Sequence, residues 1–258
     1  MEGLLKSYVG LIYAFMYLPV VVIALFSFNS AEMMAFPMTD FTIGWYDLVL
    51  HDGRLLTGLA NSLLIAAPTA LISTMLGAMA GLALTRYHFR GQIAFAVLLI
   101  IPFFIPKVIL AVADIIAMQA VGMAHSVVAI IAAQSLIILP FCAMVIVSVL
   151  IRLDRRLEEA AADLGATGWQ VFERVQLPLM RNGLIASFFI AFVLSSSEYV
   201  VTSFVSGRTQ PLSVLVASDF RFHLSPKLDA LATLIVVANI LLVAGGELVR
   251  RRAKGAVG

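Results

Sequence analysis

The chain has 258 residues, of which 62% are hydrophobic and 12% are charged, and its net charge is +2. Ordinary soluble domains carry about 25% charged residues, so this composition excludes a typical soluble protein and indicates an integral membrane protein. The small net charge excludes the basic surface typical of nucleic-acid binding, so no nucleic-acid partner is expected. The single cysteine, Cys142, excludes a disulfide framework or a cysteine metal cluster.

Six apolar segments are long enough to cross a bilayer, which takes about 20 helical residues. They cover residues 8–28, 61–84, 92–117, 127–150, 183–205 and 229–249. Lipid offers the backbone no hydrogen-bond partners, so uniformly apolar runs of this length are expected to be helices. The first segment is too long for the apolar region of a signal peptide and is expected to be retained. The sequence therefore predicts an all-α membrane protein with one transmembrane domain over residues 1–258.

The segment 29–58, between the first two apolar runs, mixes aromatic and acidic residues such as Trp45, Tyr46 and Asp47. Trp and Tyr favour the membrane–water interface, so residues 42–50 are expected to form a short interfacial helix. A second polar segment, 206–228, falls on the same side of the membrane. These two outer segments leave room for a docked external partner.

Prolines interrupt two of the predicted helices. Pro102 and Pro106 lie within 92–117, and Pro140 lies within 127–150. Each proline removes a helix hydrogen bond and favours a kink. For Pro140 a functional kink and a proline that the membrane helix merely tolerates are equally open. The closely spaced Pro102 and Pro106 instead favour a local break that lines a cavity.

The segment 152–182 is a charged island between apolar runs. Its first part, 152–164, has the composition of a helix, and Gly165 supplies a plausible helix end. Thr167 can cap a second short helix through Val175, which Pro178 is expected to stop. The two helices would share an apolar ridge that needs the bundle or a partner to cover it. This ridge includes Ala160, Ala161, Leu164, Trp169 and Phe172.

The distribution of basic residues predicts the orientation, because cationic loops stay on the cytoplasmic side. Six helices return the chain to its starting side, so both termini are expected in the cytoplasm. The side with twelve basic residues receives Lys6, Arg86, Arg90, Arg152, Arg155, Arg156, Arg174, Arg181, Arg250, Arg251, Arg252 and Lys254. The other side receives five, namely Arg54, Lys107, Arg208, Arg221 and Lys227.

The charged island also carries a spaced motif. Glu159-Ala160-Ala161 is followed after three residues by Gly165, after nine more by Val175, and after one more by Leu177-Pro178. This spacing resembles the EAA loop of ABC-importer permeases, and every fixed position of that pattern is present. Further likeness to this family lies in 41–46, 61–63 and 86–91, so the resemblance covers most of the chain.

The resemblance implies a type I ABC importer permease with six transmembrane helices and a cytoplasmic coupling loop over 152–182. In this family the loop docks into the ATPase subunit, and a small packed helix can transmit rigid-body motion. The implied coupling residues are Glu159, Ala160, Ala161, Gly165, Ala166, Leu177 and Pro178. The implied partners are a homologous second permease, an ABC ATPase dimer, a periplasmic or extracellular solute-binding protein and the lipid bilayer. The implied location is the bacterial inner membrane.

The chain lacks the Gly-rich phosphate loop of ATPases, so no cofactor of its own is expected and ATP with Mg²⁺ would be bound by the partner ATPase. It also lacks a cluster of catalytic groups, so an enzyme is not expected. The histidines are scattered without metal-ligand spacing, which predicts no metal site. They are His51, His88, His125 and His223.

The cargo is suggested by a further likeness, to the second permease subunit of spermidine/putrescine importers, in 202–207, 224–226 and 229–233. Carboxylates inside membrane segments are costly unless they line a polar path or find partners. Glu198 and Asp114 are therefore candidates for the translocation pathway, with Ser197 and Tyr199 beside Glu198. Tyr199 can offer a π face to a cation. A structural hydrogen bond or salt bridge of Glu198 to another subunit remains equally open.

The polyamine branch tends to carry paired acidic residues in the fifth helix, where this chain has one, Glu198. A choline-like, opine or aminophosphonate cargo therefore stays open. An ion-coupled secondary transporter is the other function class, but such proteins usually show internal repeats with interrupted helices in both halves. No convincing repeat is present, and this class would leave the coupling-loop motif unexplained.

Overall fold

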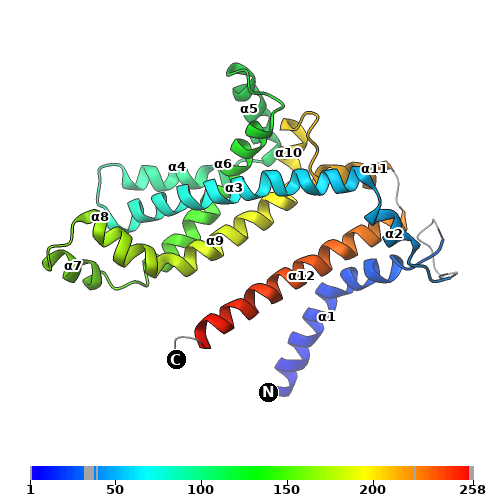
Figure 1. The fold of residues 1–258 in the computed structure, drawn as a ribbon, viewed down its shortest axis with the longest axis horizontal. Coiled ribbons are helices and arrows are strands. Elements are labelled where there is room, and N and C mark those ends of the chain that lie inside the picture. Colours follow the sequence, from blue (N-terminus) through cyan, green and yellow to red (C-terminus); the bar gives the residue numbers. More distant parts are fainter. Residues whose placement is uncertain (1, 32–37, 39, 223–224, 256–258) are drawn as a thin grey trace. The chain divides into compact units, whose positions relative to one another are not determined.

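The computed structural model describes residues 2–31, 38, 40–222 and 225–255. Within these ranges the regular secondary structure is helical, with one isolated β-bridge between Asn29 and Phe41 (Figure 1). The all-α fold is therefore confirmed. His223 and Leu224, which entered the sequence predictions, lie outside the described residues.

The described chain contains twelve α-helices and one π-helical segment. In order they are α1 (Glu2–Phe26), α2 (Gly44–Leu50), α3 (Gly53–Arg86), α4 (Gln92–Phe104), α5 (Lys107–Ala120), α6 (Val127–Leu150), α7 (Arg156–Asp163), α8 (Gly168–Val171), the π-helical segment η1 (Phe172–Gln176), α9 (Leu177–Ser197), α10 (Val200–Val205), α11 (Leu212–Phe222) and α12 (Pro226–Gly255).

Four continuous helices of the described chain are long and apolar enough to cross a membrane: 5–26, 53–86, 127–150 and 168–197. A fifth span results if α4 and α5 count as one bent span. The sixth predicted segment, 229–249, lies within α12. The helical class is thus clear, whereas the count of six spans stays a prediction.

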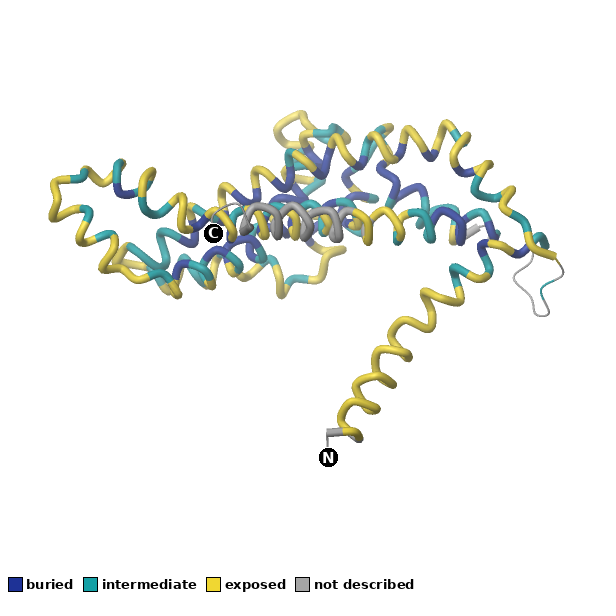
Figure 2. The backbone as a smooth tube through the Cα atoms, turned by 60° about the horizontal axis from the view of Figure 1, so that its bottom comes forward, coloured by how far each residue is buried: buried dark blue, intermediate teal, exposed yellow. Residues whose placement is uncertain are grey.

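The helices gather into two compact units, 57–215 and 1–56 with 216–258. In the second of these, α12 packs against α1 and α2. The short helix expected over 42–50 is α2, and Trp45 Nε1 donates to Asn29 O at 2.7 Å. The apolar helix α1 is exposed along most of its length (Figure 2). An apolar surface of this extent is stable only against lipid or another protein.

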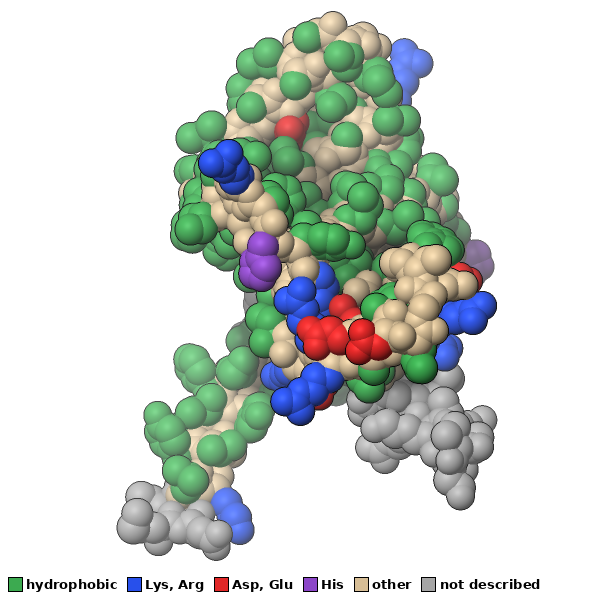
Figure 3. Space-filling view, turned by 90° about the vertical axis from the view of Figure 1, so that its left-hand side faces the viewer, with side chains coloured by type: hydrophobic (Ala, Val, Ile, Leu, Met, Phe, Trp, Pro, Cys, Tyr) green, Lys and Arg blue, Asp and Glu red, His purple; other side chains and the backbone are tan. Residues whose placement is uncertain are grey.

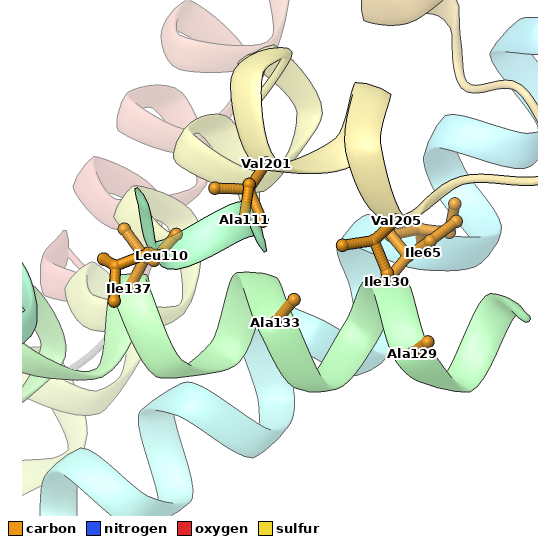
Figure 4. Packing of buried hydrophobic residues seen from close by; sticks show 9 residues of the cluster. All are labelled: Ile65, Leu110, Ala111, Ala129, Ile130, Ala133, Ile137, Val201 and Val205. Atoms are coloured by element: carbon orange, nitrogen blue, oxygen red, sulfur yellow. The ribbon is translucent and has the colours of Figure 1, made fainter. Parts of the chain in front are cut away.

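The unit formed by 57–215 has a core built from four helices. Residues from α3, α5, α6 and α10 form a buried apolar cluster (Figure 4). Its members are Ile65, Leu110, Ala111, Ala129, Ile130, Ala133, Ile137, Val201 and Val205. Three of these residues are alanines, which let the helix backbones approach closely where they lie.

The contact between α3 and α6 depends on two glycines spaced four residues apart. A Cβ built on Gly77 would lie 2.6 Å from Cys142 Cβ, and one on Gly81 would lie 2.9 Å from Ile146 Cγ2. Helices that meet through glycines at this spacing pack backbone to backbone. Cys142 lies at this contact, and its residue is fully buried.

Two predicted helices are broken in the structure. The segment 92–117 is divided at Ile105-Pro106 into α4 and α5, which meet at a 107° bend. The break expected from the proline pair is therefore present, because Pro106 removes the N–H that would continue the helix. In contrast, α6 runs through Pro140 without interruption.

The second break was not predicted. The segment 183–205 was expected to be one helix, but α9 ends at Ser197 and α10 begins at Val200. Glu198 at the junction has an extended backbone, with φ −71° and ψ 113°. The segment 183–205 is apolar on both sides of this break. Hydropathy indicates only whether residues can lie in lipid and carries no information on the direction of the backbone, so it did not predict the break.

Candidate coupling surface and translocation site

The predicted coupling loop is a helix, a tight glycine turn and a second helix. α7 ends at Asp163, and Gly165 follows with φ +88°. Ala166 N donates to Ala161 O at 3.1 Å, while Gly165 N donates to Ala162 O at 2.9 Å. This pair of bonds is the Schellman ending, which needs a left-handed residue at the position of Gly165. The helix end predicted at Gly165 is confirmed.

The second helix of the loop begins with a capping box. Thr167 Oγ1 accepts from Gln170 N at 3.4 Å, and Gln170 Oε1 accepts from Thr167 N at 2.8 Å. These bonds satisfy two backbone donors at a helix start. The cap predicted at Thr167 is therefore confirmed.

The predicted stop at Leu177-Pro178 is wrong. The helix that begins at Gly168 continues through η1 and α9 to Ser197. Leu177 N donates to Phe172 O, five residues back, so the hydrogen-bond register changes just before Pro178. A π-type turn at this point accommodates the missing proline N–H near the start of α9. Pro178 therefore lies inside a continuous rod that joins the loop to a membrane helix.

The apolar ridge of the loop is left largely uncovered by this chain. Leu164 is 90% exposed and Trp169 is 69% exposed, and the Trp169 ring lies 5.5 Å from that of Phe172. Ala160 is exposed and Ala161 half-buried, as is Ala166, while Leu177 and Pro178 are exposed. Large exposed apolar residues beside charged ones are typical of a docking surface. Figure 3 shows charges of both signs gathered at this end of the 57–215 unit.

One buried ion pair fastens the loop to a membrane helix. Arg86, the last residue of α3, donates from Nε to Glu158 Oε1 at 2.7 Å, and the side chains are 8% and 13% exposed. Gln176 Nε2 donates to the other oxygen of Glu158 at 2.8 Å. Glu158 therefore joins α3, α7 and η1. The neighbouring Glu159 is 66% exposed and lies 3.9 Å from Arg155 in a weak pair.

Glu198 lies at the break between α9 and α10, where its residue is 7% exposed. Its Oε2 lies 2.5 Å from Lys107 Nζ, and its Oε1 accepts from Val201 N at 3.2 Å. Ser213 Oγ donates to its backbone oxygen at 3.0 Å. The carboxylate is thus held by an ammonium and by a backbone N–H in the first turn of α10, where the helix dipole favours negative charge.

A buried polar cluster brackets this break. Ser195 Oγ donates to Gln134 Oε1, and Gln134 Nε2 donates to Thr202 Oγ1 at 2.8 Å. Ser195 precedes Glu198 on α9 and Thr202 follows it on α10, so one side chain of α6 ties both ends of the broken helix. Satisfied polar groups in an apolar interior fix a single arrangement of the helices.

The other predicted pathway residues are placed differently. Ser197 Oγ donates to Val193 O at 2.9 Å within its own helix. Tyr199 is half-buried and its backbone oxygen accepts from Ser203 N. Asp114 is half-buried on α5, and its Oδ2 has no hydrogen-bond partner within the described part of the chain. Among the described residues, Asp114 Oδ2 therefore makes no hydrogen bond to Glu198.

The sequence did not predict which side chains would pair with Glu198 or hold the coupling loop in place. Arg86, Lys107, Gln134 and Glu158 were not proposed as site residues. The position of Lys107 directly after Pro106 was the available signal, because a charged residue next to a helix break in an apolar segment needs a partner. Among the described residues no group of three or more His, Cys, Asp or Glu side chains could hold a metal ion.

Comparison with known proteins identifies the chain. Residues 73–255 match the family described as the binding-protein-dependent transport system inner membrane component. The chain belongs to this family. The permease is 30% identical over 249 residues to the spermidine/putrescine transport system permease protein PotC of Escherichia coli K12, covering 96% of this chain and 94% of that protein. It is 34% identical over 236 residues to the putrescine transport system permease protein PotI of the same organism, covering 88% and 83% of the two chains.

Solved structures show the same fold. A bacterial ABC transporter involved in the import of the acidic polysaccharide alginate aligns with a TM-score of 0.70 at 17% identity, covering 97% of this chain and 95% of that chain. At this identity the likeness is one of fold alone. The resemblance drawn from the EAA spacing is confirmed, and the protein is the membrane permease subunit of an ABC importer.

Proposed function

We propose that this permease imports a small polyamine-type cation, of the spermidine or putrescine class. The observation that carries this proposal is the near full-length similarity to PotC and PotI, which are named for these cargoes. The permease contributes one half of the membrane path, and a homologous second permease contributes the other. A solute-binding protein delivers the cargo, as the match to a binding-protein-dependent family supports.

The proposed cargo contact is the Glu198 carboxylate. It is nearly buried at a helix break, and a charge in such a position attracts an ammonium strongly because little water screens it. Tyr199 follows it and can offer a ring face to a cation. Ser197 and Asp114 are proposed to line the same path, with the unpartnered Oδ2 of Asp114 as a second acceptor.

The proposed coupling surface is formed by Glu159, Ala160, Ala161, Gly165, Ala166, Leu177 and Pro178. It docks on a partner ATPase dimer, which binds ATP and Mg²⁺ and supplies the energy. The exposed Leu164 and Trp169 support this role, because they provide an apolar anchor that the permease itself does not cover. The continuous helix from Gly168 to Ser197 then carries motion of the docked loop toward Glu198.

The proposed orientation places both termini and the coupling loop in the cytoplasm. It follows from the twelve basic residues on that side against five on the other. Cysteine labelling from either side of the membrane, at exposed positions such as Leu164 and His51, tests it. Labelling of Leu164→Cys from outside intact cells would contradict this orientation.

The cargo is tested by reconstituting the permease with its second permease, its ATPase and its binding protein in liposomes. ATP-dependent uptake of labelled putrescine and spermidine is expected. Uptake of choline or an aminophosphonate in their place would assign another amine cargo, to which the single carboxylate Glu198 is also suited. Uptake by the permease alone, driven by an ion gradient, would contradict the importer mechanism.

A matched pair of variants tests the role of Glu198. Glu198→Gln keeps the shape and the hydrogen bond to Val201 N but removes the charge, so uptake of putrescine is expected to fall by at least tenfold. Glu173→Gln, at an exposed position of η1, is the control for loss of one carboxylate. Unchanged transport kinetics in Glu198→Gln, with the complex intact, would remove Glu198 from the pathway.

A further inference from the structure

We infer that Lys107 is a tethered counterion that occupies the cargo's ammonium position at Glu198 and is displaced when the cargo enters. This inference rests on the proposed function, in which Glu198 lies on the path of an amine cargo. It assigns a specificity role to Lys107: a solute must bring a positive charge in order to replace the one already present.

The two groups meet because each lies at a helix break. Lys107 is the first residue of α5, directly after the 107° bend at Pro106, and Glu198 separates α9 from α10. The backbones of α5 and α10 are held together by apolar packing, in which Leu110 and Ala111 lie in the same cluster as Val201 (Figure 4). This packing holds the helices together independently of the ion pair, so opening the pair does not require the helices to separate.

The two partners differ in their freedom to move. The Glu198 side chain is 8% exposed, whereas that of Lys107 is 51% exposed. Val201 N holds the second carboxylate oxygen, so the carboxylate is anchored on both sides. The Lys107 ammonium has no other hydrogen-bond or ion-pair partner within the described residues, and its flexible four-carbon stem allows it to swing into water. Opening the pair therefore moves the lysine and leaves the carboxylate in position.

Electrostatics makes exchange more favourable than either alternative. If Lys107 left without replacement, a nearly buried carboxylate would be unpaired, which is strongly unfavourable. If an ammonium cargo joined Lys107 at Glu198, two cations would repel each other beside one anion. Exchange of one ammonium for another leaves the carboxylate paired both before and after the cargo binds. Neutral and anionic solutes cannot perform this exchange, so Lys107 excludes them and also prevents the site from standing empty.

The test is the kinetics of Lys107→Met in the reconstituted importer. Methionine keeps most of the length and the apolar stem of lysine and removes the ammonium, with its charge and its hydrogen bond to Glu198. The KM for putrescine delivered by its binding protein is expected to fall about fivefold, with kcat changed less than twofold. The matched control is Arg90→Met, which removes a basic residue from an exposed position in the same unit, outside the outer segments and the coupling loop, and is expected to leave KM unchanged.

A charge swap separates this role from a purely structural one. Lys107→Glu combined with Glu198→Lys preserves an ion pair but places a cation in the buried position. Loss of putrescine uptake in an assembled complex supports the inference, whereas restored uptake would show that only the pairing matters. Lys107→Gln, which can still donate to Glu198, is the second variant if Lys107→Met does not assemble, and it is expected to lower KM in the same direction. Failure of both to assemble would make the pair structural and overturn the inference.

Uptake by the wild-type importer distinguishes failure of the proposed cargo from failure of the proposed role of Lys107. If the wild-type importer does not take up putrescine or another amine, the proposed cargo is wrong and the role of Lys107 falls with it. If the wild type takes up putrescine while Lys107→Met has an unchanged or higher KM, the displacement role alone is wrong and the cargo stands.

Discussion

Arg86 and Glu158 form a nearly buried ion pair between the end of a membrane helix and the coupling loop, with Nε 2.7 Å from Oε1. Glu158 also accepts from Gln176, so one carboxylate contacts α3 and η1 from its place in α7. Glu159, the acidic residue of the EAA motif, points its charge toward water instead. The two adjacent carboxylates therefore differ in role: Glu158 holds the loop to the rest of the permease, whereas Glu159 makes only a weak exposed pair with Arg155.

The first prediction compares these two carboxylates. Glu158→Gln leaves the Arg86 guanidinium buried without its counterion, which is expected to destabilise the folded permease by about 3 kcal/mol. Glu159→Gln is the matched control and is expected to change stability by less than about 1 kcal/mol, since exposed pairs contribute little. Thermal unfolding of the purified permease in nanodiscs measures both. Equal destabilisation by the two variants would contradict this division.

The second prediction isolates the backbone at the loop turn. A Cβ added at Gly165 or at Gly168 meets no atom within 4 Å, but only Gly165 has a positive φ. Gly165→Ala is therefore expected to cost about 1–2 kcal/mol, whereas Gly168→Ala is expected to be neutral. The readouts are thermal stability and the number of ATP molecules hydrolysed per cargo imported. The turn has no special role if both alanine variants behave like the wild type.

The third prediction concerns the polar cluster on α6. Gln134→Leu leaves the hydroxyls of Ser195 and Thr202 without their partner, and an unpaired buried polar group costs about 1–3 kcal/mol. Ser135→Ala removes a neighbouring buried hydroxyl that has no hydrogen-bond partner in the described residues, so it is expected to be neutral or stabilising. Thermal unfolding compares the two. A stable Gln134→Leu variant would show that apolar packing alone holds the Glu198 break.

The fourth prediction concerns pH and Asp52, which directly precedes α3. The hydrogen bond from Lys227 lowers the pKa of Asp52 below its ordinary value of 3.8. Lys227 Nζ lies 2.6 Å from Asp52 Oδ2, and both side chains are partly exposed. Because the pKa is lower in the folded than in the unfolded protein, the stabilisation is present above the unfolded value and is lost as pH falls through the folded one.

Lys227→Met removes this contribution. The stability difference between wild type and Lys227→Met is therefore expected to be constant from about pH 7 to about pH 5 and to shrink below about pH 4. Thermal unfolding across this range measures it. A difference that persists undiminished at about pH 3 would assign the effect of Lys227 to packing of its stem and not to its charge.

Local features of this protein were readable from the sequence. The apolar runs determined the helical class, since the backbone in lipid must satisfy its own hydrogen bonds. The motif from Glu159 to Pro178 determined the family. Gly165 and Thr167 determined the turn and the cap of the coupling loop, because each acts on backbone groups within a few residues of itself.

The partners of the buried charges were decided only by the tertiary structure. Arg86 and Glu158 are 72 residues apart, and Lys107 and Glu198 are 91 residues apart. Which side chains meet depends on how each helix is rotated and where it breaks. In a membrane protein both the lipid-facing and the core-facing sides of a helix are apolar, so hydropathy does not reveal the rotation. Hydropathy likewise did not predict the break at Glu198 or the continuous helix through Pro178. At both places packing and hydrogen bonds determine the course of the backbone.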